Sequence, residues 1–185
     1  MFKTLLIAAV LVGLAATLSA QVIDPDTFKV SYFSNNYGTS PGATVQLTNV
    51  GTSGGNVCAD IYVFDPTQEL AECCSCMLTP DGLTTLSVFI DLTSDTLTGV
   101  PLRNGVIKIV SAATSGNNCP LTTAPKPTPG VRAWGTHEQN AGYVTETAFQ
   151  DSGLSAAELS SLAAQCKAIH LVGSGKGVCT CGTGD

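Results

Sequence analysis

Apolar and polar residues alternate along most of the chain after residue 20, and this period of two predicts short β-strands. The pattern, or a short apolar run rich in β-branched and aromatic residues, occurs in segments 27–33, 43–50, 56–65, 83–92, 105–112, 131–138 and 143–149. Residues that favour turns separate these segments, as in 34–42 and 79–82. We therefore expect a mainly β fold, an antiparallel β-sandwich of immunoglobulin-like type.

The segment 114–130 departs from the strand pattern because it is rich in proline. Its prolines are Pro120, Pro125, Pro127 and Pro129. Proline cannot donate to a β-ladder, which excludes a central strand here. We expect a long crossover loop inside one domain that spans residues 21–185.

The segment 154–170 predicts a single C-terminal helix at about 155–170. Apolar residues recur there at intervals of three and four, which places them on one helix face: Leu159, Leu162, Cys166 and Ile169. Ser155 and Glu158 have the spacing of a capping box, and Leu154 with Leu159 that of a hydrophobic staple. We expect the helix to stop at Gly173.

The first residues have the order of a secretory signal peptide. Lys3 precedes an apolar run from Leu5 to Leu18, and the small residues Ser19 and Ala20 follow. The run has roughly 14 residues, which is shorter than the roughly 20 of a membrane-spanning helix. We expect residues 1–20 to be removed, and the rest to be secreted or displayed on a cell surface, with the periplasm as a further location. No stable membrane insertion is expected after cleavage.

Charge narrows the choice of partners. The net charge is −6, only 12% of residues are charged, and no Lys or Arg cluster occurs. Nucleic acid is therefore an improbable partner, because its phosphates need basic side chains. Weak charge repulsion is compatible with self-association or with a cell-surface partner.

All eight cysteines follow the signal segment: Cys58, Cys73, Cys74, Cys76, Cys119, Cys166, Cys179 and Cys181. An even number in an exported chain predicts disulfides. We expect the cluster at 73–76 to act as a loop whose cysteines reach different elements. Cys58 is one expected partner of this cluster, Cys166 is expected to pair with Cys179 or Cys181, and the remaining cysteines would reach back to the cluster.

Crowded thiols also raise the alternative of a metal or redox site. Zinc knuckles, c-type haem attachment and thioredoxin-like redox centres all use a Cys-x-x-Cys spacing, which this chain lacks. Copper(I) or zinc bound by closely spaced thiolates remains an open alternative. No cofactor is expected.

Three segments resemble a group of uncharacterised, cysteine-bearing secreted bacterial proteins, a family of unknown function. They are 47–83 with its "ECCSC", 132–137 with "RAWGTH", and 145–162 with "TETAFQDSGLSAAELSSL". The resemblance covers most of the chain after residue 20. It implies a secreted disulfide domain and no catalytic residue.

No catalytic motif is recognisable, so we do not expect an enzyme. The alternative is a hydrolase that uses His137 with Glu138 or Glu146. Residues considered as ligand contacts are Trp134, His137, Glu138 and Tyr143, with Trp134 as a ring on which a sugar could stack.

We expect a structural or adhesive protein, with residues 21–30 as a candidate strand for self-association. The alternative is an extracellular module that binds carbohydrate or a soft metal.

Overall fold

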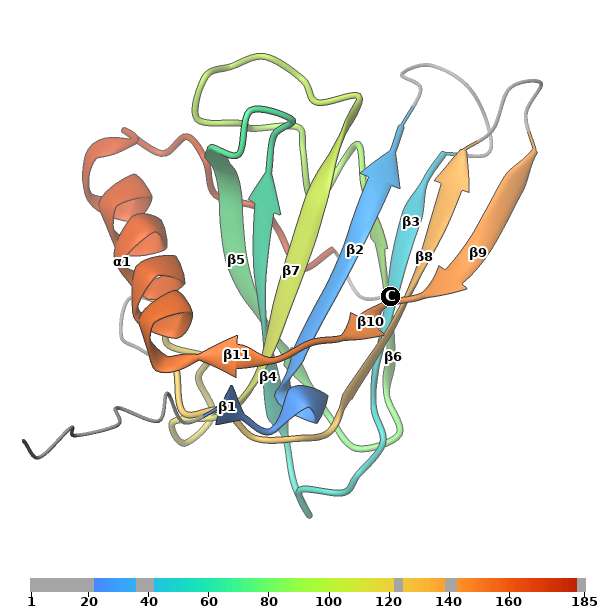
Figure 1. Ribbon diagram of the computed structural model, residues 1–185, viewed down its shortest axis with the longest axis vertical. Coiled ribbons are helices and arrows are strands. Elements are labelled where there is room, and N and C mark those ends of the chain that lie inside the picture. The colour runs from blue at the N-terminus through green and yellow to red at the C-terminus, as the bar shows by residue number, and fades with distance from the viewer. Residues whose placement is uncertain (1–21, 36–41, 122–124, 139–142, 183–185) are drawn as a thin grey trace, which may run out of the picture.

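The structure is a computed structural model that describes residues 22–35, 42–121, 125–138 and 143–182. The predicted signal peptide, residues 1–20, lies outside this range. Two antiparallel sheets form most of the molecule (Figure 1). The first sheet has the order β10 (Gln150–Asp151), β2 (Phe28–Ser34), β7 (Asn104–Ala113), β4 (Val57–Phe64) and β5 (Leu70–Leu78). The second has the order β6 (Leu83–Ser87), β3 (Thr44–Asn49), β8 (Val131–Glu138) and β9 (Val144–Ala148).

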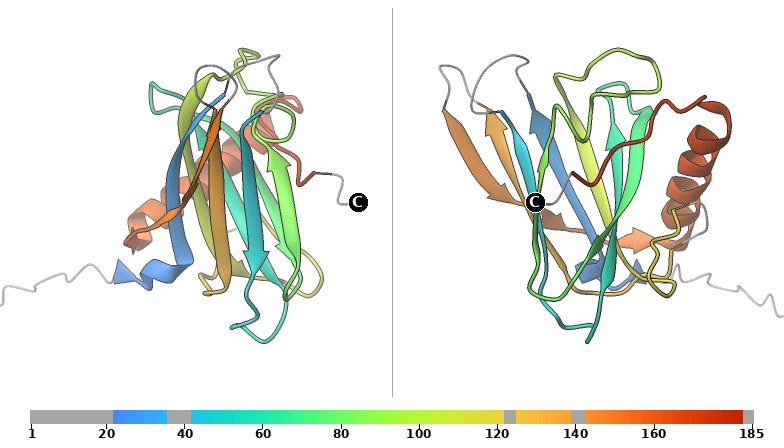
Figure 2. Two further views of the ribbon diagram at one scale, coloured as in Figure 1. Left: turned by 90° about the vertical axis from the view of Figure 1, so that its right-hand side faces the viewer. Right: turned by 180° about the vertical axis from the view of Figure 1, so that it is seen from behind.

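Three short elements and one helix complete the described chain. β1 (Val22–Ile23) pairs with β11 (Leu154–Ser155), and the 3₁₀ turn η1 (Pro25–Thr27) leads from β1 into β2. The helix α1 (Ala156–Val172) packs beside β5, as Figures 1 and 2 show. The predicted fold class is therefore confirmed: a mainly β sandwich with one C-terminal helix and disulfides.

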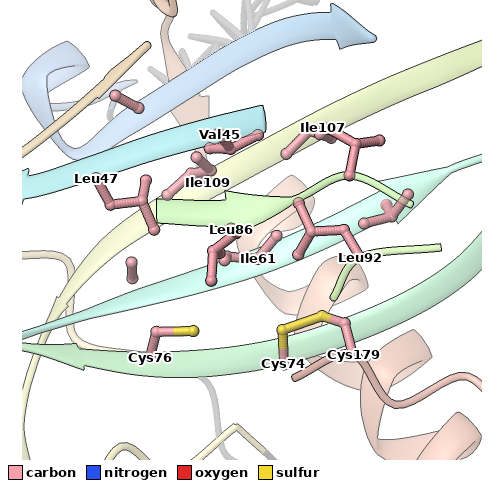
Figure 3. Packing of buried hydrophobic residues seen from close by; sticks show 14 of the residues in the cluster. Val45, Leu47, Ile61, Cys74, Cys76, Leu86, Leu92, Ile107, Ile109 and Cys179 are labelled. Atoms are coloured by element: carbon pink, nitrogen blue, oxygen red, sulfur yellow. A yellow bond between two sulfur atoms is a disulfide. The ribbon is translucent and has the colours of Figure 1, made fainter. Parts of the chain in front are cut away.

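The main hydrophobic core lies between the two sheets. Alternate residues of the strands meet there, including Leu47, Ile61, Leu86 and Ile109, each completely buried (Figure 3). A second core lies on the outer face of the five-stranded sheet, where Tyr62 and Cys73 contact residues of α1 such as Leu162. β4 is thus buried on both faces, which explains its apolar run.

The prediction of a loop for the cysteine cluster at 73–76 was wrong, because these residues lie on the nine-residue strand β5. A register shift between Val63 and Phe64 of β4 marks a bulge opposite the start of β5. Beyond the bulge, Cys74 and Cys76 point into the main core, whereas Cys73 points toward α1. Burial on both faces removes the polar alternation by which a strand is usually recognised.

The strand predicted at 83–92 ends earlier, at Ser87. Asp91 accepts a hydrogen bond from the Ser87 amide at 2.7 Å and donates its own amide to the Ser87 carbonyl at 2.9 Å. These two bonds close a turn. Val88 and Leu92 are nevertheless buried, so their apolar character reflects packing against the core and not a strand.

Helix α1 begins where the sequence predicted. Ser155 is the N-cap, and its hydroxyl accepts a hydrogen bond from the Glu158 amide at 3.1 Å. The carboxylate of Glu158 pairs with Lys108 of β7 at 2.6 Å, so it ties the helix to the sheet. The helix ends at Gly173, the predicted stop.

The proline-rich crossover loop is confirmed in its described part. It carries the chain from β7 of one sheet to β8 of the other. The amide of Ala113 donates to Lys126 and that of Thr128 to Ser111, both at 2.9 Å. The pairing of β2 with β7 stops at Phe28, opposite Val110. Residues 126–128 pair with the rest of β7 along the same edge.

Candidate functional site

All eight cysteines form disulfides, and the cluster on β5 holds two other parts of the chain, α1 and the segment that follows it. The pairs are Cys58–Cys119, Cys73–Cys166, Cys74–Cys179 and Cys76–Cys181. The expectation that the cluster reaches separate elements is confirmed. The expected partners of Cys58, Cys119 and Cys166 were wrong: Cys58 pairs with Cys119 of the crossover loop and not with the cluster, and Cys166 pairs with Cys73 of β5 and not with the tail.

The segment after α1 runs parallel to the edge of β5. The amide of Cys73 donates to the Gly177 carbonyl at 2.9 Å, and the amide of Cys179 donates to the Cys73 carbonyl at 3.3 Å. Cys74–Cys179 and Cys76–Cys181 both have a sequence separation of 105, so the register stays constant between them. This disulfide ladder covers an edge that would otherwise be open to pairing with another chain. Figure 3 shows Cys74–Cys179 directed from β5 into the core.

The same sulfur atoms are those considered as metal ligands. The sulfurs of Cys74, Cys76 and Cys181 lie within 4.8 Å of one another, and His170 lies similarly close to Cys73 and Cys166. Thiolates are the ligand form of cysteine. A soft metal at either place would therefore require reduction of the disulfides first.

A buried carboxylate that the sequence analysis missed lies next to the ladder. Glu72 on β5 is completely buried, and one of its oxygens accepts a hydrogen bond from the Asp95 amide at 2.9 Å. Its other oxygen has no hydrogen-bond partner in the described part of the chain. Burial, reinforced by the charge of Asp95, raises the pKa of Glu72 to about 7, although this amide and Lys176 oppose the shift.

Trp134 lies on the outer face of the four-stranded sheet. Its strand neighbours across this face are Gln46 and Ala148, with Thr85 next to Gln46. Hydroxyl groups of Thr44 and Thr136 contact each other at 3.0 Å in the adjoining row. We call this surface the Trp134 face and define it as Thr44, Gln46, Thr48, Thr85, Ser87, Trp134 and Thr136, which the pairing registers place together.

His137 lies on the opposite face of β8 from Trp134. A ligand bound on one face of the sheet therefore does not contact both side chains. His137 is 1% exposed, and its Nε2 lies 2.7 Å from the Thr147 hydroxyl. The ring of Tyr32 from β2 stacks on it at 4.1 Å between centroids. Burial lowers the pKa of His137, and its Nδ1 has no partner among the described residues.

The remaining sequence candidates are not gathered around His137. Glu146 pairs in register with Thr136, so its side chain projects on the outer face, away from the His137 ring. Tyr143 is 73% exposed and precedes β9. The side chain of Glu138 lies outside the described part of the structure. The described geometry thus brings no carboxylate from these candidates to the imidazole.

The described part of the chain includes no helix with the length and apolar character needed to cross a membrane. Comparison with protein-family models, with curated proteins and with solved structures finds no match.

Proposed function

We propose that the protein is an exported structural or adhesive β-sandwich whose Trp134 face contacts polysaccharide. The observation that carries this proposal is the row Thr85, Gln46 and Trp134 on neighbouring strands, with Thr44 and Thr136 beside it. An indole ring stacks on the apolar face of a sugar, and hydroxyl and amide groups can donate to and accept from sugar hydroxyls. In Figure 2 (right), α1 lies on the far side of β5 and does not cross these strands.

The charge distribution supports a neutral ligand. The Trp134 face is composed of hydroxyl, amide and aromatic side chains. The described charged residues on the same side of the sheet lie at its border and are of opposite sign: Arg132, which pairs with Asp26 at 2.5 Å, and the exposed Glu146 opposite Thr136. A neutral polysaccharide makes no demand for counter-charges, in contrast to nucleic acid.

Export is supported by four disulfides, which persist in oxidising compartments, and by the signal-like residues 1–20. Expression of residues 1–185 in a bacterial host, followed by cell fractionation and mass spectrometry, tests this. We expect an exported protein whose N-terminal peptide starts at Gln21. An intact residue 1–20 segment in a cytoplasmic protein with free thiols would contradict it.

Binding to washed cellulose and chitin tests the adhesive role. We expect the wild-type protein to be retained on at least one of them, and Trp134→Ala to bind at least about 10-fold more weakly. Tyr143→Ala is the matched control, because it removes an exposed aromatic ring outside the Trp134 face. Equal retention of Trp134→Ala and wild type, or retention of neither, would refute a polysaccharide contact at this face.

Self-association by residues 21–30 is less well supported. The described residues of this segment are already paired within the chain, in β1 with β11 and in β2 with β7. β9 is more suitable for strand addition, because it is an edge strand of the four-stranded sheet and all five of its residues are exposed.

A further inference from the structure

A pocket of about 250 Å³ lies on the outer face of the five-stranded sheet, on the other sheet from the Trp134 face. Its floor is formed by residues of β4 and β7, and its rim by Ser115, Pro120, Pro125 and Lys126, which belong to the described part of the crossover loop. The lining residues used below are Cys58, Asp60, Ala112, Ser115, Pro120 and Lys126. The floor residues are buried, whereas Ser115, Pro120 and Lys126 at the rim are exposed.

The walls of this pocket are held in place covalently and by backbone hydrogen bonds. Cys58–Cys119 joins the floor to the loop immediately before Pro120. On the other side, the Lys126 carbonyl accepts from the Ala113 amide at 2.9 Å. A concave site with fixed walls reduces the ordering entropy that a ligand must overcome.

Asp60 is the charged group on the floor. It is 2% exposed, and one of its oxygens accepts a hydrogen bond from the Ser75 hydroxyl. Among the described residues, its second oxygen has no hydrogen-bond partner and no cation forms an ion pair with it. Burial raises the pKa of Asp60 to about 6, so the carboxyl is mostly ionised at pH 7.

An ionised carboxylate without a cation is unfavourable at a buried position. An apolar side chain could take the place of Asp60 on this strand face. Neighbouring positions on the same strand face, such as Tyr62 and Phe64, pack into the second core. A buried, unpaired charge that faces a pocket is therefore a strong indication of a ligand.

We propose that this pocket binds a small molecule with a primary ammonium group, of the size of one amino sugar or one amino acid. The ammonium group donates to Asp60 on the floor. The ligand's hydroxyl or carboxylate oxygens lie toward Lys126 at the rim. Ala112 and Pro120 contact its carbon skeleton.

A bare metal ion fits these observations less well. Calcium takes six to eight oxygen ligands, and Asp60 is the single carboxylate that lines the described pocket. The volume is also too large for an ion, since an engineered cavity of about 150 Å³ in another protein accommodates benzene. Alanine and proline walls suit a carbon skeleton better than a hydrated ion.

Titration of ¹⁵N-labelled protein at pH 7, followed by NMR, tests the proposal. The probes are glucosamine and alanine as two sources of the ammonium group, glucose as an uncharged analogue of glucosamine, and calcium chloride. We expect the amides of Ala112, Thr114 and Ser115 to shift with glucosamine, alanine or both. The relative affinities of the two distinguish a sugar site from an amino-acid site.

Two variants localise the effect. Asp60→Asn keeps the size of the side chain and an oxygen for the Ser75 hydroxyl, and we expect it to weaken binding at least about 10-fold. Glu69→Gln removes the same charge from an exposed position in the β4–β5 turn, and should bind like wild type. An unchanged spectrum with both ammonium probes, equal shifts with glucose, full binding by Asp60→Asn, or shifts with calcium alone would each overturn the proposal.

Discussion

The ring of Tyr32 stacks on the imidazole of His137 with an interplanar angle of 17°. Tyr32 belongs to the five-stranded sheet and His137 to the four-stranded sheet, so the stack joins the two layers of the sandwich at one side. Since Tyr32 is 58% exposed and His137 is buried, the tyrosine shields the histidine from water.

Removal of this shield should weaken the sandwich modestly. We expect Tyr32→Ala to lower the free energy of unfolding by about 1 kcal/mol, in line with aromatic pairs. Tyr143→Ala, which removes an exposed ring, should change it by less than about 0.5 kcal/mol. Urea unfolding measures both. Equal effects of the two substitutions would contradict a stabilising stack.

The same variant should change the titration of His137. Burial lowers the pKa of this imidazole, and Tyr32→Ala admits water to the ring, so its pKa should rise toward the ordinary value. Because the folded pKa is depressed in wild type, the neutral ring's contribution to stability is complete above the ordinary pKa and declines as pH falls below it. NMR titration of the imidazole protons measures the change. An unaltered or lower pKa in the variant would contradict shielding by Tyr32.

Removal of both ladder disulfides should lower the free energy of unfolding by more than twice the loss caused by removal of one. Because Cys73–Cys166 already joins β5 to α1, either ladder disulfide alone closes a loop of only roughly 15–20 residues through that bond, which restricts the unfolded chain by about 3 kcal/mol. The second then closes only a small ring. We expect Cys76→Ala with Cys181→Ala to lower the free energy of unfolding by about 2 kcal/mol, and removal of both disulfides by about 5 kcal/mol.

Denaturant unfolding under non-reducing conditions measures this difference. The matched control is Cys58→Ala with Cys119→Ala, which opens a loop of 61 residues elsewhere in the fold. If each ladder disulfide contributed the same amount whether or not the other was present, a shared loop would not be the source of their stabilisation.

Asp60→Asn should stabilise the protein at neutral pH. The folded pKa of about 6 lies above the unfolded value, so the folded state binds the proton more tightly and wild-type stability falls as pH rises from about 4 to 6. The ionised carboxyl then lowers stability by an amount on the order of 3 kcal/mol at pH 7. Thermal unfolding should show a higher Tm for the variant at pH 7 and little difference at pH 4. A lower Tm at pH 7 would contradict this.

Glu72→Gln should have a similar effect at higher pH. Burial raises the pKa of Glu72 to about 7, and the folded state therefore loses stability as pH rises through that value. We expect the variant to exceed wild type by an amount on the order of 1–2 kcal/mol at pH 8 and to match it at pH 4. Urea unfolding at the two pH values measures the difference; the exposed Glu69→Gln should show none.

Much of the architecture was predictable from local pattern. The strands at 105–112 and 131–138 and the helix after Ser155 agree with the structure because period and caps are local signals. β5 was not predictable in this way, since both its faces are buried and its cysteines suggested a loop. The Cys-x-Cys spacing repeated at 74–76 and 179–181 was the available signal for a ladder of constant register.

The sites were harder to predict than the fold. Trp134 and His137 are three residues apart, and this spacing on a strand places their side chains on opposite faces. They were considered together as ligand contacts, but they do not share a surface. Asp60 was overlooked inside the apolar run of β4. A single carboxylate within a strand buried on both faces is a signal that can be read from sequence once that burial is recognised.

The constant spacing of the ladder also has a consequence for the timing of folding. The edge of β5 is completed by residues that lie 105 positions later in the chain. At a ribosomal rate of roughly 5–20 residues per second, that edge stays open for about 5–20 s after β5 is made. During this interval the backbone groups along that edge of β5 are open to pairing with a strand of a neighbouring polypeptide.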